Sequence, residues 1–149
     1  MSTTIYTDGS NAYAKGPGAW AVVIDRDGVK TTACGFDPCT TANRMEMLAA
    51  IEGLGLLPPG EPARLVSDSQ HLIGGMTKRW NLIQNRSLWQ QLFRLNKERT
   101  VDWEWARRGC GGPLHDEAHH LAEVELRRGM ERLGQVDDPD HWAPRRSIR

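Results

Sequence analysis

The chain has 149 residues and balances 19 Lys and Arg against 19 Asp and Glu, so its formal charge is zero. That length fits one domain with a buried core, and the charge balance means that any affinity for nucleic acid must come from local asymmetry. No apolar run approaches the ~18 residues of a membrane span, and the N-terminus lacks the apolar segment of a signal peptide. We therefore expect a soluble, cytoplasmic protein that contacts no membrane, and nothing in the sequence requires more than a monomer.

Charge is unevenly distributed along the chain. Residues 1–70 carry 5 Lys and Arg against 8 Asp and Glu, whereas residues 76–108 carry 8 against 3. An acidic first half followed by a basic middle fits a metal site beside a phosphate-binding face. The ordinary surface of a soluble protein fits the same distribution, so charge alone does not decide between the two.

The first third of the chain is predicted to form three strands. Runs of β-branched, aromatic and apolar residues predict strands at Thr3–Asp8, Ala19–Ile24 and Val29–Gly35. The glycines and proline within Gly9–Gly18 predict a turn region, and Asp25–Gly28 predicts a hairpin turn. We expect these strands to form an antiparallel meander.

Helices dominate the remainder. A helix is predicted from Thr40–Thr41 to about Leu57, a parallel strand at Arg64–Ser67 and a further strand at Val101–Trp105. Three more helices are predicted, from Ser69 to about Met76, from an N-cap at Ser87 onward, and from His115 to about Met130. The fold class is thus α/β, a mixed (α+β) five-stranded sheet flanked by helices. Residues 1–135 form the predicted domain, and 136–149 a flexible tail of low apolar content.

Three acidic residues occupy unusual places in this pattern. Asp8 ends the first predicted strand, Asp68 follows the fourth, and Glu46 lies among apolar residues of the first helix. The carboxyl ends of parallel strands are where open α/β sheets bind ligands. Each acid taken alone could be a helix cap or a surface charge. The three together favour a site for a hard cation, which prefers oxygen ligands.

Four short motifs carry a resemblance to a known family. Thr7-Asp8-Gly9-Ser10, Asn43-Arg44-Met45-Glu46, Ser67-Asp68-Ser69-Gln70 and Trp103-Glu104-Trp105 resemble the signature of type 1 ribonuclease H, in the same order and spacing. The similarity covers about Thr3 to Leu126. It implies a ribonuclease H-like fold with strand order 3-2-1-4-5. It also implies endonucleolytic hydrolysis of the RNA strand of RNA/DNA hybrids, which leaves 5′-phosphate ends.

The resemblance also assigns a metal site. It implies that two Mg²⁺ or Mn²⁺ ions per site support catalysis, with Asp8 bridging both, Glu46 binding one and Asp68 the other. Two such ions about 4 Å apart can activate a water molecule and stabilise the leaving oxygen.

Substrate contacts are implied in the same way. Asn43 and Gln70 match positions that contact the minor groove, and the backbone near Asn11 matches a contact to a ribose 2′-hydroxyl, the group that distinguishes RNA from DNA. Thr41 matches a contact to a DNA phosphate, although an N-cap role suits it equally well. The expected substrate-binding set is Gly9, Ser10, Asn11, Thr41, Asn43 and Gln70.

The last helix departs from the family pattern. The resemblance puts His119 where the family has a fourth active-site Asp, and Gly109 where a loop His is usual. An imidazole at that position adds no negative charge and suits Mn²⁺ better than Mg²⁺. We predict His119 as a fourth metal ligand and catalytic residue at a weakened second metal position. The sequence does not show whether His115 approaches the site.

A second departure lies in the substrate-binding region. The basic insertion that some family members use to grip hybrid is short here, spanning only Met76–Ser87. Basic and aromatic residues within it, at Lys78, Arg79, Trp80 and Arg86, could supply phosphate contacts and a stacking ring. A solvated helix face with a core Trp is an equally good interpretation.

Other functions are considered against the same residues. His115–His119 does not match a zinc-protease motif, which needs Glu directly after the first His. A structural zinc site from His115, His119 and Cys110 stays open. A hybrid-binding module with weak or lost catalysis is the main alternative, and another nuclease of the same superfold is a further one.

Overall fold

The computed structural model describes residues 2–80, 82–135 and 145–148. Its strands are β1 (Thr3–Asn11), β2 (Gly16–Arg26), β3 (Val29–Thr40), β4 (Ala63–Ser67), β5 (Val101–Trp105) and β6 (Arg145–Ile148). Its helices are α1 (Ala42–Gly55), α2 (Gln70–Lys78), α3 (Arg86–Glu98) and α4 (Pro113–Gln135). No helix in these ranges is long and apolar enough to cross a membrane.

One mixed sheet organises the molecule. Its strand order is β5-β4-β1-β2-β3-β6, with β2 antiparallel to both β1 and β3, and β4 parallel to both β1 and β5. The predicted five-stranded order 3-2-1-4-5 is therefore confirmed.

A sixth strand corrects the prediction for the tail. Residues 145–148 pair antiparallel with β3 rather than fraying, because β3 would otherwise offer an open edge of backbone hydrogen-bonding groups. Residues 136–144 lie outside the described residues, and the domain boundary at 135 stays a prediction.

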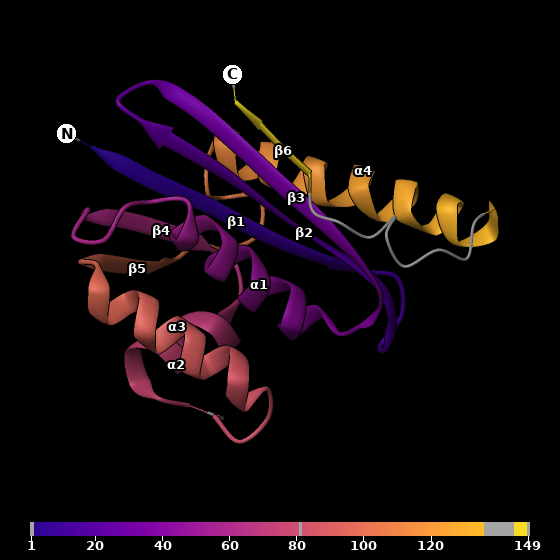
Figure 1. Cartoon of the computed structure of the whole chain (residues 1–149), viewed down its shortest axis with the longest axis horizontal. Helices are drawn as coiled ribbons and strands as arrows, with labels where there is room; N and C mark the ends of the chain where they lie inside the picture. The colour runs from indigo at the N-terminus through magenta and orange to yellow at the C-terminus, as the bar shows by residue number, and fades with distance from the viewer. Residues whose placement is uncertain (1, 81, 136–144, 149) are drawn as a thin grey trace.

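Helices cover both faces of the sheet (Figure 1). The helices α1 and α3 pack together on one face, while α4 runs across β1, β2 and β3 on the other. The main core fills the layer under α1 and is built from Ile5, Trp20, Val22, Ile24, Met45, Met47, Leu54, Leu65, Leu72, Trp89 and Leu92.

Several element boundaries differ from those predicted. The predicted turn region Gly9–Gly18 shrinks to residues 12–15, because β1 continues to Asn11 and β2 begins at Gly16. Gly18 serves a close strand contact rather than a turn, since a Cβ there would lie 2.5 Å from Cγ2 of Thr40. The strand β3 likewise extends beyond Gly35 to Thr40.

The helix ends also differ. Asn85, in the left-handed conformation, precedes α3 where Ser87 was predicted as N-cap. Gly74 and Gly75 lie inside α2, because the rings of Trp80 and Trp89 pack where their side chains would stand. The helix α4 begins at Pro113, a residue well suited to a first helical position, and extends to Gln135.

Candidate active site

Strand register brings Asp8 and Asp68 together. The parallel strands β1 and β4 pair from Thr4 with Arg64 to Tyr6 with Val66. Asp8 and Asp68 each stand two residues beyond that last pair, so the shared direction of the strands puts them opposite each other. Asp8 lies within β1 rather than at its end, which corrects the prediction, and is 1% exposed. Asp68 follows β4 as predicted.

Glu46 reaches the same place from α1. It is 8% exposed, and its Oε1 accepts a hydrogen bond from the backbone N–H of Gly9 at 2.9 Å. The glycine makes this contact possible, because a Cβ at position 9 would lie 2.8 Å from the backbone nitrogen of Glu46. Gly9, predicted as a substrate contact, therefore also sets the approach of α1 to β1.

The three carboxylates repel one another electrostatically. Burial raises the pKa of Glu46 well above its usual range, and the negative charges of Asp8 and Asp68 raise it further. Burial and Asp8 also raise the pKa of Asp68, against the opposing effect of His115, Arg108 and His119. Within the described residues, Oε2 of Glu46 is buried and accepts no hydrogen bond. Clustered, half-satisfied carboxylates of this kind fit a divalent cation.

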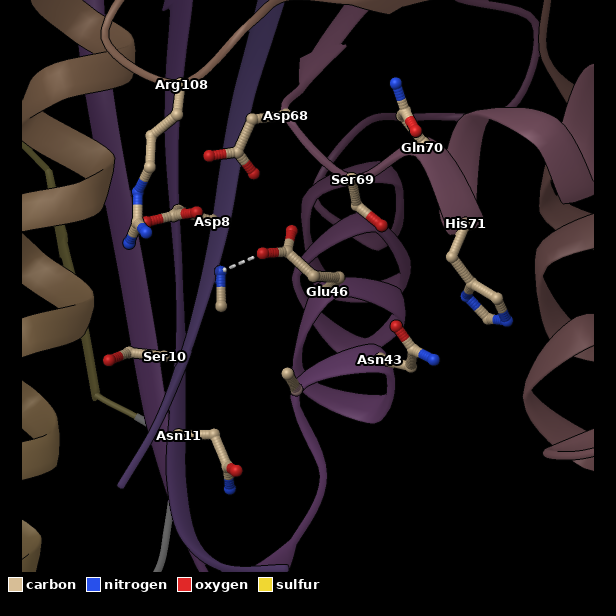
Figure 2. Close-up of a pocket in the computed structure, with 12 residues that line it drawn as sticks. Asp8, Ser10, Asn11, Asn43, Glu46, Asp68, Ser69, Gln70, His71 and Arg108 are labelled. Atoms are coloured by element: carbon tan, nitrogen blue, oxygen red, sulfur yellow. Dashed lines mark hydrogen bonds between the residues drawn. The ribbon is translucent and has the colours of Figure 1, made fainter. Parts of the chain in front are cut away.

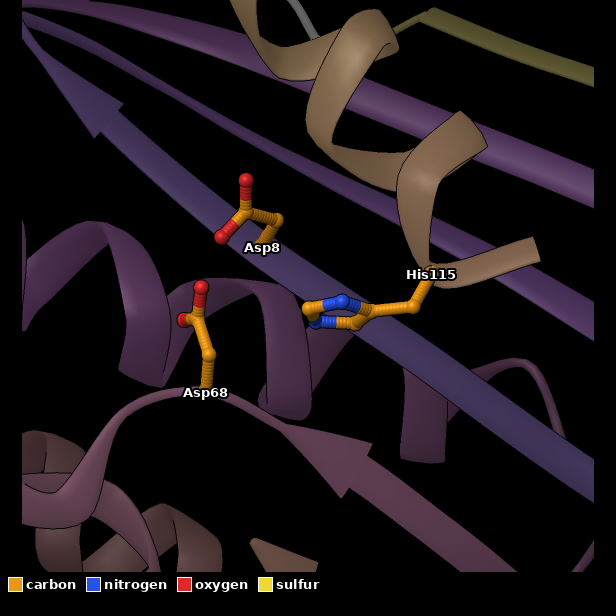
Figure 3. Close-up of side chains that lie close together, drawn as sticks. All are labelled: Asp8, Asp68 and His115. Atoms are coloured by element: carbon orange, nitrogen blue, oxygen red, sulfur yellow. The ribbon is translucent and has the colours of Figure 1, made fainter. Parts of the chain in front are cut away.

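Two histidines of α4 face these acids, one helical turn apart. Nδ1 of His119 lies 2.6 Å from Oδ2 of Asp8, and its Nε2 lies 3.0 Å from Oε1 of Glu123. His115 faces both carboxylates, and one ligand atom each from Asp8, Asp68 and His115 falls within 4.8 Å of the others (Figure 3). The predicted ligand His119 thus contacts Asp8 directly, and its role as a metal ligand stays a prediction.

The acids open onto a cavity of about 530 Å³. Figure 2 shows their side chains converging there from β1, α1 and the β4–α2 turn. The cavity gathers most of the predicted site: Asp8, Gly9, Ser10, Asn11, Asn43, Glu46, Asp68 and Gln70.

Thr41 is used differently. Its side chain accepts from the backbone N–H of Arg44 at 3.3 Å and caps α1, which confirms the N-cap interpretation and leaves the phosphate contact a prediction.

Three residues near this site were not assigned from the sequence. Arg108 and His71 line the cavity, and His115 joins the carboxylate pair. Arg108 directly precedes Gly109 in the β5–α4 loop, so the loop places a cation beside Asp68 although it lacks the usual histidine. His71 follows Gln70 at the start of α2 and packs against Trp89. Adjacency to a matched motif was the available signal for Arg108 and His71.

Three tryptophans near the site have different surroundings. Nε1 of Trp105 donates to the backbone carbonyl of Asp68 at 3.1 Å and so fixes the turn that carries this acid. Trp89 is a core residue, whereas Trp80 is 50% exposed with Nζ of Lys78 4.9 Å from its ring centre. An exposed ring beside a cation is a surface that can stack on a base or sugar.

The open zinc alternative finds no support in this arrangement. Among the described residues that could hold a metal ion, the group includes Asp8, Asp68 and His115 but neither Cys110 nor His119. Cys110 is an exposed thiol in the β5–α4 loop.

Sheet order, the crossing helix α4 and the acid cluster together define a ribonuclease H-like fold. Solved structures agree. The N-terminal RNase H domain of a Mycobacterium tuberculosis protein has a TM-score of 0.75 at 21% identity, covering 89% of this chain and 98% of that one. LC11-RNase H1, solved in complex with an RNA/DNA hybrid, has a TM-score of 0.70 at 19% identity, covering 86% of this chain and 99% of that one.

Sequence comparison gives the family. The RNase H family model matches residues 1–123. Ribonuclease HI of Caulobacter vibrioides is 34% identical over 143 residues, covering 87% of this chain and 96% of that protein. The chain belongs to the RNase H family and is a ribonuclease H enzyme.

Proposed function

We propose that this protein is a metal-dependent endonuclease that hydrolyses the RNA strand of RNA/DNA hybrids by a two-metal-ion mechanism. The observation that carries the proposal is the convergence of Asp8, Glu46 and Asp68, from three separate elements, on one open cavity. The RNA/DNA hybrid bound to LC11-RNase H1 supports the same substrate class here.

The residues present fit the metal that the family implies. Asp8, Glu46 and Asp68 would hold the metal, and a cation bound there would offset the repulsion that raises the pKa of Glu46 and Asp68. Bound Mg²⁺ or Mn²⁺ supplies charge for the phosphate and acidifies water. The backbone N–H of Gly9 holds Glu46 in place.

Positioning of the substrate falls to the cavity walls. Arg108 adds a positive charge beside Asp68, where it can contact a phosphate of the bound strand. The side-chain amide of Asn11 donates to the carbonyls of Pro17 and Thr40, at 3.0 and 3.3 Å. This ties the β1–β2 turn to the end of β3 and leaves the Asn11 backbone for the proposed 2′-hydroxyl contact. Asn43 and Gln70 lie across the cavity and are proposed to contact the minor groove.

One observation favours the alternative of a hybrid-binding module with weak catalysis. Asp8, the acid proposed to be shared between the ions, already contacts His119 at 2.6 Å, and an imidazole there adds no negative charge and competes with a cation for that carboxylate. The two functions share the same surface and differ only in turnover.

Cleavage of labelled duplexes tests the proposal. We expect the wild-type chain to cut RNA/DNA hybrid with Mg²⁺ or Mn²⁺ and to spare RNA/RNA and DNA/DNA. Asp8→Asn should reduce the rate about a thousandfold, since loss of a shared ligand removes several kcal/mol of transition-state stabilisation. Asp102→Asn, on an exposed position of β5, is the matched control. Tight hybrid binding without cleavage by the wild type in either metal would establish the binding module instead.

A further inference from the structure

His115 occupies a position that its burial makes costly. It lies in the first turn of α4 and is 2% exposed, and its Nε2 has no hydrogen-bond partner within the described residues. A buried nitrogen without a partner destabilises the folded state, so its presence at this position calls for a physical reason.

The ring is also held in one orientation. A Cβ at Gly111 would lie 2.7 Å from Cγ and 2.8 Å from Cβ and Nδ1 of His115, so the loop backbone packs directly on the side chain. Figure 3 shows the ring projecting from the start of α4 toward the carboxylates of Asp8 and Asp68. The imidazole is therefore both fixed and aimed at the acid pair.

The imidazole of His115 and the carboxylates of Asp8 and Asp68 leave a space between them. The ligand atoms of Asp8, Asp68 and His115 all lie within 4.8 Å of one another, yet Nε2 of His115 makes no hydrogen bond to either acid in the described part of the chain. Two ligands on opposite sides of an ion are separated by roughly 4.2–4.4 Å when each bond is about 2.1–2.2 Å. A small closure of the three groups would accommodate one ion between them.

We propose that His115, rather than His119, joins Asp8 and Asp68 as a metal ligand, and that it makes this position prefer a borderline transition-metal ion such as Mn²⁺ over Mg²⁺. Imidazole nitrogen is a ligand for transition metals, whereas Mg²⁺ takes oxygen donors almost alone. Both imidazole nitrogens of His119 already face carboxylates, those of Asp8 and Glu123. The inference shares its carboxylates with the proposed nuclease site and rests on that site binding metal.

Calorimetric titration of the full chain with Mn²⁺ and with Mg²⁺ tests this without relying on cleavage. His115→Gln should weaken Mn²⁺ binding at least about tenfold and change Mg²⁺ binding less than threefold, which is about 0.6 kcal/mol. The visible absorption of Co²⁺ bound to the wild type should show a nitrogen ligand that His115→Gln removes. His120→Ala changes an exposed histidine of the same helix and should leave both metals and the spectrum unaltered.

A second variant tests the same inference if His115→Gln fails to fold. Gly111→Ala keeps the imidazole but pushes on it, and should show the same selective loss of Mn²⁺ affinity. Equal losses for both metals, or no loss for either, would overturn the inference. Cleavage of hybrid with Mg²⁺ separates the two proposals. Selective Mn²⁺ binding without cleavage would refute only the nuclease function, whereas cleavage without selectivity would refute only the role of His115.

Discussion

The two sides of the site are built by different means. Asp8, Glu46 and Asp68 stand on β1, on α1 and directly after β4, where strand register and a glycine contact leave their positions little freedom. The facing imidazoles stand on α4, which follows a loop with Gly109 and Gly112 at positive φ. The carboxylate side thus follows from local rules, whereas the imidazole side depends on the path of one loop.

The two sides of the site should therefore differ in how well they tolerate substitution. Asp8 and Glu46 of the carboxylate side are buried, so a change there alters both chemistry and packing. The α4 side meets the sheet through small residues, Ala118 and Ala122, which leave room for side chains of another type. That room is consistent with His119 standing where the resemblance implies an acid, without a change in the sheet.

Adding one methyl group on the carboxylate side should reduce the cleavage rate more than a change on the α4 side. Gly9→Ala places a Cβ 2.8 Å from the backbone nitrogen of Glu46 and 2.9 Å from Cβ of Met45, so α1 must move away from β1 and carry Glu46 with it. A displacement near 1 Å at a catalytic group costs about a hundredfold in rate. Cleavage of hybrid at saturating metal measures this.

The matched control for Gly9→Ala is Gly55→Ala at the end of α1, where an added Cβ meets nothing within 4 Å. That variant should cleave at the wild-type rate. Full activity in Gly9→Ala would mean that the position of Glu46 is not set by this contact.

A smaller effect is expected from the imidazole side. His119→Ala removes the group that lies 2.6 Å from Oδ2 of Asp8 and frees that carboxylate to rotate. Loss of such a supporting contact costs about tenfold in activity or metal affinity. The effect should appear chiefly as weaker metal binding, seen as a higher metal concentration at half-maximal rate, with the saturated rate nearly restored.

His120→Ala is the control on the same helix. A tenfold loss that persists at saturating metal would instead assign His119 a direct part in the reaction.

Most of the fold could be predicted from the sequence because it follows from short-range patterns. Alternating and apolar runs located five strands, and the helix between β3 and β4 required β4 to run parallel to β1, which placed Asp68 beside Asp8. A boundary failed where a glycine serves packing rather than a turn, as at Gly18. The edge strand β6 escaped notice because its four residues lack an apolar pattern.

The α4 side could not be predicted as well, for a physical reason. Resemblance identified His119 by counting residues from Trp105, but whether a second imidazole also reaches the acids depends on the loop between residues 106 and 112. Its glycines allow backbone conformations that composition does not specify, and one of them, Gly111, packs on His115. The motif located the helix and His119, but it did not show that His115 also faces the acids.

The smallest expected effect concerns stability rather than rate, and it tests whether the carboxylate side is strained without metal. Burial and the charges of Asp8 and Asp68 raise the pKa of Glu46. A carboxyl whose pKa is raised on folding binds its proton more tightly in the folded state, so stability falls as pH rises above the unfolded value of about 4.3.

Glu46→Gln cannot ionise, and its amide oxygen can still accept a hydrogen bond from the backbone N–H of Gly9. In metal-free buffer at pH 7 its melting temperature should therefore exceed that of the wild type, by roughly 2–4 °C for each kcal/mol of repulsion removed. The difference should fall away as pH drops well below about 4.3, where the wild-type carboxyl is protonated in both states. Added Mg²⁺ should stabilise the wild type more than the variant, because the cation binds only the ionised cluster. Glu131→Gln, exposed on α4, should show none of these shifts. A lower melting temperature for Glu46→Gln at pH 7 would mean that the ionised carboxylate is satisfied by the protein itself, and that the cluster does not need a cation to neutralise it.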